Sequence, residues 1–195
     1  MDGDSELYLE TKTTLIPSIN EPYLEIVTGD KTESLLMTSI NSPLVVNGEY
    51  VAVVSFDITL EQLKKIIEDI KPYEGSYAFL LSNKGMMSGH PNTDYLNKPV
   101  EEIFPNDSKD FNIPEKVKKG ETFSYLSNDE NGIQTYYTYA PINVANTNTP
   151  WSISIAVPVK TIMADAITNF RISIFVGIIG ILLMALVIAI IGKNI

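Results

Sequence analysis

The side chains that most often carry chemistry are sparse in this sequence. Its 195 residues include one histidine, no cysteine and 24 acidic residues. The lack of cysteine excludes disulfides, thiolate nucleophiles and Cys-based metal sites. His90 has no second ligand at metal-binding spacing, so we expect it to be a solvated side chain in a polar loop. No metal or cofactor is predicted.

Catalytic motifs are also missing. The sequence has no G-x-S-x-G, H-E-x-x-H, G-x-G-x-x-G or P-loop pattern, and one histidine cannot serve a site that needs two. Catalysis by carboxylates alone is the remaining enzymatic alternative, but no acidic residue stands in a diagnostic motif. We therefore predict a protein that binds its partner and is not an enzyme.

The C-terminal segment 172–191 reads ISIFVGIIGILLMALVIAII and contains no charge. Twenty helical residues span roughly 30 Å, the thickness of the hydrocarbon core of a bilayer. The segment predicts a transmembrane helix, with the lipid bilayer as a partner. The alternative, a buried helix of a soluble core, would normally have a polar face.

Charge is concentrated before this helix. All 24 acidic residues and 13 of the 14 basic ones lie in residues 1–171, which carry a net charge of −11. Such a region is a poor nucleic-acid binder and is repelled by anionic headgroups. Lys160 and Arg171 precede the helix and Lys193 follows it, so the positive-inside rule does not decide the orientation.

The first elements are predicted from periodicity and turn residues. Segments 35–40 and 50–57 are rich in strand-forming residues, and Asn47-Gly48 between them is a hairpin signal. Thr59 and Gln62 have the spacing of a capping box, and apolar residues then recur at helical spacing over 60–70. We expect a hairpin followed by a helix.

The rest of the region before the membrane helix predicts more strands. Their ranges are 77–82, 122–126, 134–139 and 151–157. The last of these alternates apolar and polar residues, as on a half-buried sheet, and begins with Trp151, which we expect in the core or an interface. Four prolines make 85–120 a region of loops and short helices. No breaker lies between Val159 and Gly177, which predicts one rod over 159–191 that either conducts a signal or only anchors the domain.

A weak internal repeat joins these elements. Ser42-Pro43-Leu44, the strand AVVSFD and the helix after it resemble Ala140-Pro141-Ile142, the strand SISIAV and the helix from Lys160. The repeat favours two α/β modules in tandem.

Five motifs in order, EPYLEIVTG, SPLVVNGEYVAVVSFDITLEQL, YAFLLSNKGMMSGHP, TYYTYAPI and PWSISIAVP, resemble the double Cache family. That family implies an α+β fold of PAS-like antiparallel-sheet modules, which serve as extracytoplasmic sensors of chemoreceptors, sensor kinases and cyclases. It normally begins with a transmembrane helix and a long stalk helix, so we expect missing sequence before residue 1.

The resemblance also implies domain boundaries. Residues 1–71 match the C-terminal half of the membrane-distal module and 72–158 the membrane-proximal module. A juxtamembrane helix (159–171), a transmembrane helix (172–191) and the start of a HAMP linker (192–195) follow. The implied function is extracytoplasmic sensing of a small molecule at the cell membrane, as a homodimer.

By resemblance, Tyr8, Tyr23 and Asp57 fall at ligand-binding positions of family members that bind amino acids. Leu7 and Ser5 stand where a tryptophan and an arginine are expected, and without that arginine the ligand carboxylate loses its cation. The carboxylate of Asp57 and the ring of Tyr23 suit an ammonium group, so an amine remains a reasonable ligand as well as an amino acid.

Structural roles for these residues are the alternative. Asp57 can start the turn into the following helix, Tyr23 can pack under a loop, and Tyr8 can lie on a helix face. Two other functions also stay open: the input domain of a sensor histidine kinase or diguanylate cyclase, and a membrane-anchored structural protein.

Overall fold

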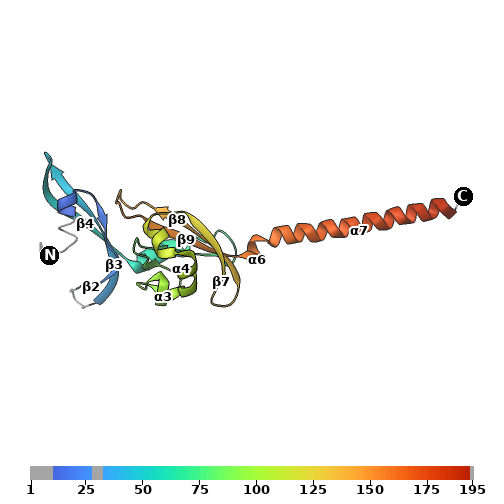
Figure 1. Cartoon of the computed structure of the whole chain (residues 1–195), viewed down its shortest axis with the longest axis horizontal. Helices are drawn as coiled ribbons and strands as arrows, with labels where there is room; N and C mark the ends of the chain where they lie inside the picture. The colour runs from blue at the N-terminus through green and yellow to red at the C-terminus, as the bar shows by residue number, and fades with distance from the viewer. Residues whose placement is uncertain (1–10, 28–32, 194–195) are drawn as a thin grey trace.

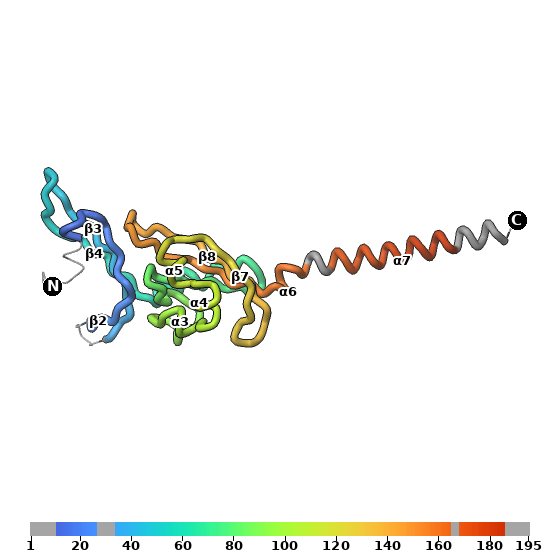
Figure 2. The backbone as a smooth tube through the Cα atoms, in the orientation of Figure 1, coloured from blue at the N-terminus to red at the C-terminus, as the bar shows by residue number. Residues whose placement is uncertain are grey.

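The computed structural model describes residues 11–27 and 33–193, which form two antiparallel sheets followed by one long helix (Figure 1). The backbone runs from the first sheet through the second sheet to the helix, so the molecule is elongated (Figure 2). This arrangement confirms the predicted α+β class, with antiparallel sheets and a C-terminal apolar helix.

A long hairpin dominates the first sheet. Its strands are β1 (Ser18–Ile19), β2 (Tyr23–Val27), β3 (Glu33–Val46) and β4 (Glu49–Thr59). β3 pairs with β4 on one side, and with β1 and β2 end to end on the other. Asn47 and Gly48 both have positive φ, 54° and 84°, as a two-residue hairpin turn requires. The predicted hairpin is confirmed, with longer strands.

Helix α2 (Leu60–Glu68) follows β4 and carries the predicted capping box. The Thr59 hydroxyl accepts the Gln62 N–H at 3.2 Å, and the Gln62 side chain accepts the Thr59 N–H at 3.1 Å. The helix ends at Glu68, two residues earlier than predicted. Its Ile67 packs so closely on Gly89 of the second sheet that a Cβ there would lie 2.9 Å from it. α2 therefore joins the two sheets.

Five strands in the order β6-β5-β9-β8-β7 form the second sheet. They are β5 (Tyr77–Leu81), β6 (Met87–Gly89), β7 (Phe123–Asn128), β8 (Gln134–Ile142) and β9 (Trp151–Pro158). Between β6 and β7 lie the 3-10 turn η1 (Thr93–Tyr95) and the helices α3 (Val100–Ile103), α4 (Pro105–Phe111) and α5 (Ile113–Lys118). Residues 85–120 thus contain the predicted short helices, and also the short strand β6.

The core lies between one face of this sheet and helices α3 and α5. It contains Phe79, Leu81, Tyr137 and Tyr139 from the strands, with Val117 from α5. Aromatic rings dominate the face: Phe123 stacks on Tyr139 at a centroid distance of 4.4 Å. This packing supplies most of the apolar burial in the second sheet.

In the central strand β9, small polar residues face the core. Ser152 and Ser154 are buried on the core face, whereas Ile153 and Ile155 are only half-buried on the other. Ser154 pairs with Phe79 on one side and with Tyr139 on the other, and these rings leave room only for a small side chain between them. Trp151 is 2% exposed, which confirms that it is buried.

The predicted rod from residue 159 is interrupted. α6 (Val159–Ile162) ends at Met163, whose N–H bonds back to the carbonyls of Thr161 and Val159, and α7 (Ala164–Lys193) begins afterwards. α7 holds an unburied apolar stretch, Thr168–Ala185, and within residues 11–27 and 33–193 it is the one helix long and apolar enough to cross a membrane. The rod therefore begins at Ala164.

Candidate functional site

Two of the three predicted ligand residues lie in one hydrogen-bonded row on the first sheet. Ser39 stands opposite Asp57 in the β3–β4 register and donates its hydroxyl proton to Asp57 Oδ1 at 2.6 Å. The hydroxyls of Tyr23 and Ser39 are also 2.6 Å apart. Because the Ser39 proton is engaged with the carboxylate, Tyr23 is the donor in this second bond. We call these three residues the Tyr23–Ser39–Asp57 row.

Burial differs along this row. Ser39 is 4% exposed, Tyr23 is half-buried and Asp57 is exposed. The carboxylate therefore remains accessible to a ligand, while the buried serine fixes its direction. Ser39 was not predicted, although it stands on β3 with Asn41 two positions further, and alternate polar residues in a strand share one face.

Asn41 extends the polar face toward the tip of the hairpin. Its side-chain amide donates to Asn20 Oδ1 at 2.9 Å and accepts from the Ser55 hydroxyl at 2.6 Å. Since the side chains along this face bond to one another, their orientations are fixed before any ligand arrives. The third predicted residue, Tyr8, lies outside the described residues, as do Leu7 and Ser5.

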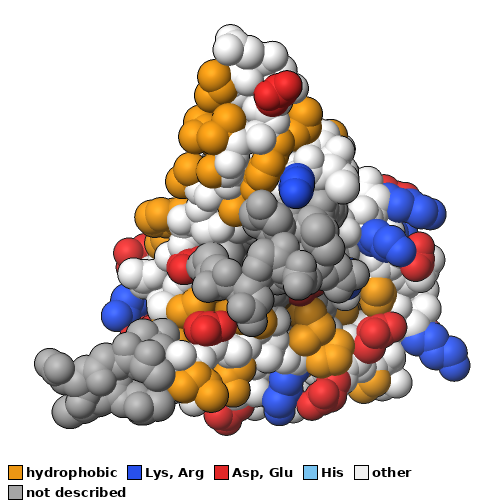
Figure 3. Space-filling view, turned by 90° about the vertical axis from the view of Figure 1, so that its left-hand side faces the viewer, with side chains coloured by type: hydrophobic (Ala, Val, Ile, Leu, Met, Phe, Trp, Pro, Cys, Tyr) orange, Lys and Arg blue, Asp and Glu red, His pale blue; other side chains and the backbone are white. Residues whose placement is uncertain are grey.

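The opposite face of the first sheet is apolar and largely open. Leu24, Ile26, Val54 and Phe56 are each about 60% exposed or slightly more. Figure 3 looks onto this end of the molecule and shows hydrophobic side chains along the projecting β3–β4 hairpin. The binding chemistry of this sheet therefore lies on its polar face.

A carboxylate beside Tyr23 connects the two sheets. Glu21, in the loop between β1 and β2, accepts hydrogen bonds from the Ser82 hydroxyl and, at 3.1 Å, from the Lys84 backbone N–H. The turn that holds Ser82 and Lys84 is itself fixed, because the Asn83 amide donates to the carbonyls of Lys118 and Pro150. Glu21 lies two residues before Tyr23, so a contact with the second sheet adjoins Tyr23 along the chain.

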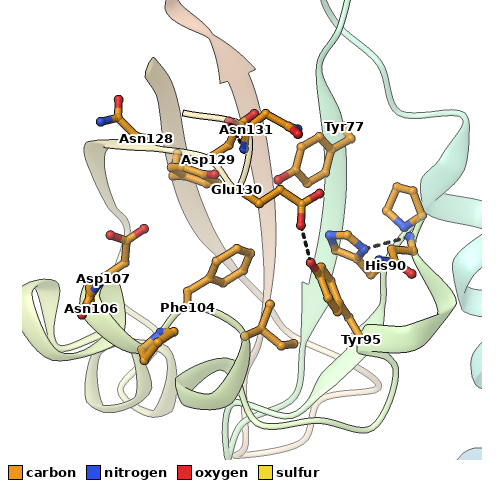
Figure 4. A pocket seen from close by; sticks show the side chains of 15 residues that line it. Tyr77, His90, Tyr95, Phe104, Asn106, Asp107, Asn128, Asp129, Glu130 and Asn131 are labelled. Carbon is orange, nitrogen blue, oxygen red and sulfur yellow. Dashed lines mark hydrogen bonds between the residues drawn. The ribbon is translucent and has the colours of Figure 1, made fainter. Parts of the chain in front are cut away.

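The second sheet carries a cavity of about 440 Å³ (Figure 4). Tyr77 and Tyr137 of the sheet line it, together with residues of three segments: 90–95, 103–107 where α3 ends and α4 begins, and 128–131 from the end of β7 into the β7–β8 loop. Its volume lies within the range of about 300–1,000 Å³ typical of small-molecule sites. It is therefore a second candidate site.

His90 lies in the wall of this cavity, which corrects the prediction of a solvated histidine. Its side chain is 5% exposed, and its ring lies 5.4 Å from that of Tyr77 and 4.8 Å from that of Tyr95. Nδ1 accepts the Asn92 N–H at 2.9 Å, so the proton of the neutral ring resides on Nε2. Burial lowers the pKa of His90 to about 4. The ring is therefore neutral at physiological pH.

The cavity also contains phenols and carboxylates. Tyr95 donates its hydroxyl to Glu130 Oε2 at 2.7 Å, which connects the two sides of the opening (Figure 4). Burial raises the pKa of Tyr137 to about 12 and that of Tyr77 further still, so both phenols remain protonated. Among the residues that the structure describes, no group of three or more histidines and carboxylates could hold a metal ion.

Comparison with known proteins identifies the family. A model described as "Cache domain" matches residues 10–166 of this chain. The chain belongs to the Cache domain family. The match includes both sheets, the Tyr23–Ser39–Asp57 row and the cavity.

Two methyl-accepting chemotaxis proteins are similar to part of this Cache protein. PctB of Pseudomonas aeruginosa is 30% identical over 91 residues, which are 47% of this chain and 14% of PctB. PscA of Pseudomonas syringae is 31% identical over 87 residues, which are 45% of this chain and 13% of PscA. The matched segments thus span only about one seventh of the length of these relatives.

Solved structures share the fold of the Cache chain. The periplasmic sensory domain of the Campylobacter jejuni chemoreceptor Tlp1 aligns with a TM-score of 0.63 at 15% identity, over 83% of this chain and 57% of that one. The ligand-binding domain of the Pseudomonas fluorescens chemoreceptor CtaA, solved in complex with L-serine, aligns with a TM-score of 0.61 at 21% identity, over 82% and 62%.

Proposed function

We propose that this chain is the extracytoplasmic ligand-sensing part of a bacterial chemoreceptor, anchored in the membrane by α7. Membership of the Cache family and similarity to methyl-accepting chemotaxis proteins support the proposal. The observation that carries it is the Tyr23–Ser39–Asp57 row. In this row, hydrogen bonds through the buried Ser39 connect Tyr23 and Asp57, which are 34 positions apart in the sequence. These bonds orient the Tyr23 ring and the Asp57 carboxylate on one face of the sheet.

The ligand is a small molecule with an ammonium group, either an amine or an amino acid. The exposed carboxylate of Asp57 receives the ammonium charge, and the face of the Tyr23 ring adds a cation–π contact. Ser39 holds one carboxylate oxygen and leaves the other for the ligand. The co-crystallised L-serine of CtaA has such a group, which agrees with this assignment.

The signal passes from Tyr23 to the second sheet through Glu21. A ligand that moves Tyr23 displaces the adjoining loop, and the Glu21 carboxylate transfers this displacement to the turn at Ser82 and Lys84. That turn directly follows β5, which pairs with β9, and β9 leads through α6 into α7. The mechanism needs only a small shift of a connected set of elements.

The domain boundaries belong to this proposal. Residues 1–71 act as part of the membrane-distal module and 72–158 as the membrane-proximal one, with α7 as the membrane anchor in a homodimer. Gly177 and Gly180 have no side chain and lie on an uncovered part of α7, so a second helix could approach the backbone closely there. The output is chemotactic, with a histidine kinase or diguanylate cyclase as the alternative and a structural anchor as the second alternative.

Titration calorimetry on the full chain in lipid nanodiscs tests the ligand assignment. A panel of L-amino acids and primary amines is titrated into the native chain, and the best ligand is then titrated into Asp57→Asn and Glu49→Gln. Both variants remove one carboxylate from β4. We expect Asp57→Asn to weaken binding at least tenfold and Glu49→Gln to leave it unchanged, because Glu49 lies at the other end of the strand. Equal affinities for all three chains would falsify the assignment.

A further inference from the structure

The cavity of the second sheet differs from the Tyr23–Ser39–Asp57 row in both place and chemistry. We propose that it is a second binding site, for a small organic cation that also offers a hydrogen-bond acceptor. This inference goes beyond the proposed function, since a sensor with one ligand at Asp57 does not require it.

The first argument is an unpartnered donor. His90 is 5% exposed, and within the described chain its Nε2 atom has no hydrogen-bond partner. Figure 4 shows this side of the ring turned into the cavity, while the other nitrogen faces Asn92. A buried N–H without a partner is costly, so the site favours a ligand that supplies an acceptor.

The second argument is charge. Among the described residues that line the cavity, three are carboxylates and none is lysine or arginine. Asp129 already accepts two backbone N–H groups and Asp107 accepts the Ser127 hydroxyl, so both are held by the fold. Within residues 11–27 and 33–193, the Glu130 carboxylate accepts a hydrogen bond from the Tyr95 hydroxyl alone, and Figure 4 shows it among the side chains that line the cavity. It is the carboxylate best placed to meet a cation.

The third argument is the aromatic lining. Tyr77, Tyr95, Phe104 and Tyr137 line the cavity together with Glu130. Aromatic faces attract cations, and quaternary ammonium groups bind well in cages of such rings. An anion would meet three carboxylates without a compensating cation, so the cavity selects against acidic ligands.

These arguments define a probe. Choline has a quaternary ammonium group for the rings and Glu130, and a hydroxyl oxygen that can accept from His90 Nε2. Tetramethylammonium keeps the charge and lacks the hydroxyl. 3,3-Dimethylbutan-1-ol has the shape and hydroxyl of choline without the charge. Comparing the affinities of the three compounds separates the contribution of the cationic group from that of the hydrogen bond to His90 Nε2.

The experiment is titration calorimetry of the full chain in nanodiscs with these three compounds. We expect choline to bind at least tenfold more tightly than 3,3-dimethylbutan-1-ol. Glu130→Gln should weaken choline and tetramethylammonium alike, by about tenfold, whereas Glu121→Gln, an exposed control outside the cavity, should change neither. Comparable affinities for choline and its neutral analogue would overturn the proposal.

His90 is tested by a pair of variants. In His90→Asn the amide oxygen can still accept the Asn92 N–H while the Nε2 donor is lost, and His90→Gln can retain a donor near Nε2. We expect His90→Asn to weaken the binding of choline severalfold and to leave the binding of tetramethylammonium unchanged. His90→Gln should retain part of the affinity for choline that His90→Asn loses. An equal loss for both cations would refute the donor role.

Asp57→Asn distinguishes the two sites. If this variant abolishes choline binding while Glu130→Gln has no effect, choline occupies the first sheet and the cavity proposal is wrong. If choline binding survives Asp57→Asn, the cavity site stands independently of the ligand proposed for the first sheet.

Discussion

The two sheets of this Cache protein differ in what covers them. The second sheet has helices over one face and a core of fully buried aromatic and aliphatic side chains. The first sheet has a hydrogen-bonded polar face, and its other face exposes Leu24, Ile26, Val54 and Phe56. Apolar burial therefore stabilises the second sheet, while the first depends on its strand pairing, its polar side chains and α2. With less apolar burial to lose, the first sheet can change its conformation at a lower cost in free energy, which suits an element that must respond to a ligand.

Replacing one phenylalanine by alanine in each sheet should show this difference in stabilisation most strongly. Phe79 is 0% exposed and Phe56 is 66% exposed. We expect Phe79→Ala to lower the free energy of unfolding by about 3–5 kcal/mol and Phe56→Ala by less than about 0.5 kcal/mol. Denaturant unfolding, followed by the fluorescence of the single Trp151 and by circular dichroism, measures both. Equal costs would mean that the exposed face of the first sheet is covered in solution.

His90, in the module of the second sheet, should also make the free energy of unfolding depend on pH. Burial lowers the pKa of His90 from 6.5 to about 4. Between about pH 4 and pH 6.5, His90 is therefore protonated in the unfolded chain and neutral in the folded chain. Stability is therefore complete above about pH 6.5 and falls as the pH drops toward 4, by up to about 3 kcal/mol.

Unfolding of the native chain and of His90→Asn at several pH values between 4 and 7 measures this effect. The variant should lose that part of the slope, while carboxylates elsewhere contribute equally to both chains. A native slope that persists unchanged in His90→Asn would show that His90 is not the responsible group.

The connection between the sheets can be weakened at Glu21. Glu21→Ala removes the acceptor of the Ser82 hydroxyl and the Lys84 N–H, and hydrogen bonds to a charged group contribute about 1.5–3 kcal/mol. We expect faster hydrogen exchange at the Lys84 amide, with little change in β8 and β9. Glu25→Ala, at an exposed position of β2, is the matched control and should leave the exchange at Lys84 unaltered.

The smallest expected effect is at the cap of α2. Thr59→Ala removes the side-chain acceptor of the Gln62 N–H and should cost about 1 kcal/mol. The same change at exposed Thr122 should cost almost nothing. Since α2 joins the sheets through Ile67, the variant should also increase hydrogen exchange in α2. Unchanged exchange there would indicate that packing alone holds the helix.

Local patterns in the sequence were sufficient for most elements. Asn47-Gly48 determines the hairpin, Thr59 and Gln62 determine the start of α2, and an uncharged apolar run determines α7, because each depends on residues close together in the chain. Non-local packing was not predictable in this way. Ser154 stands in a strand of alternating apolar and polar residues, and only the register shows that it lies on the core face between Phe79 and Tyr139, whose ring centroids are 5.7 Å apart.

Local sequence patterns predicted the class of the fold and the long apolar C-terminal helix, and a family resemblance predicted Tyr23 and Asp57 as candidate ligand residues. The folded chain was needed to show that Ser39 joins these two residues, that Glu21 connects their sheet to the second sheet, and that His90 is buried in a cavity wall. Each of these contacts joins segments that are distant in sequence. Strand register and side-chain packing bring them together, and neither can be read from one segment alone.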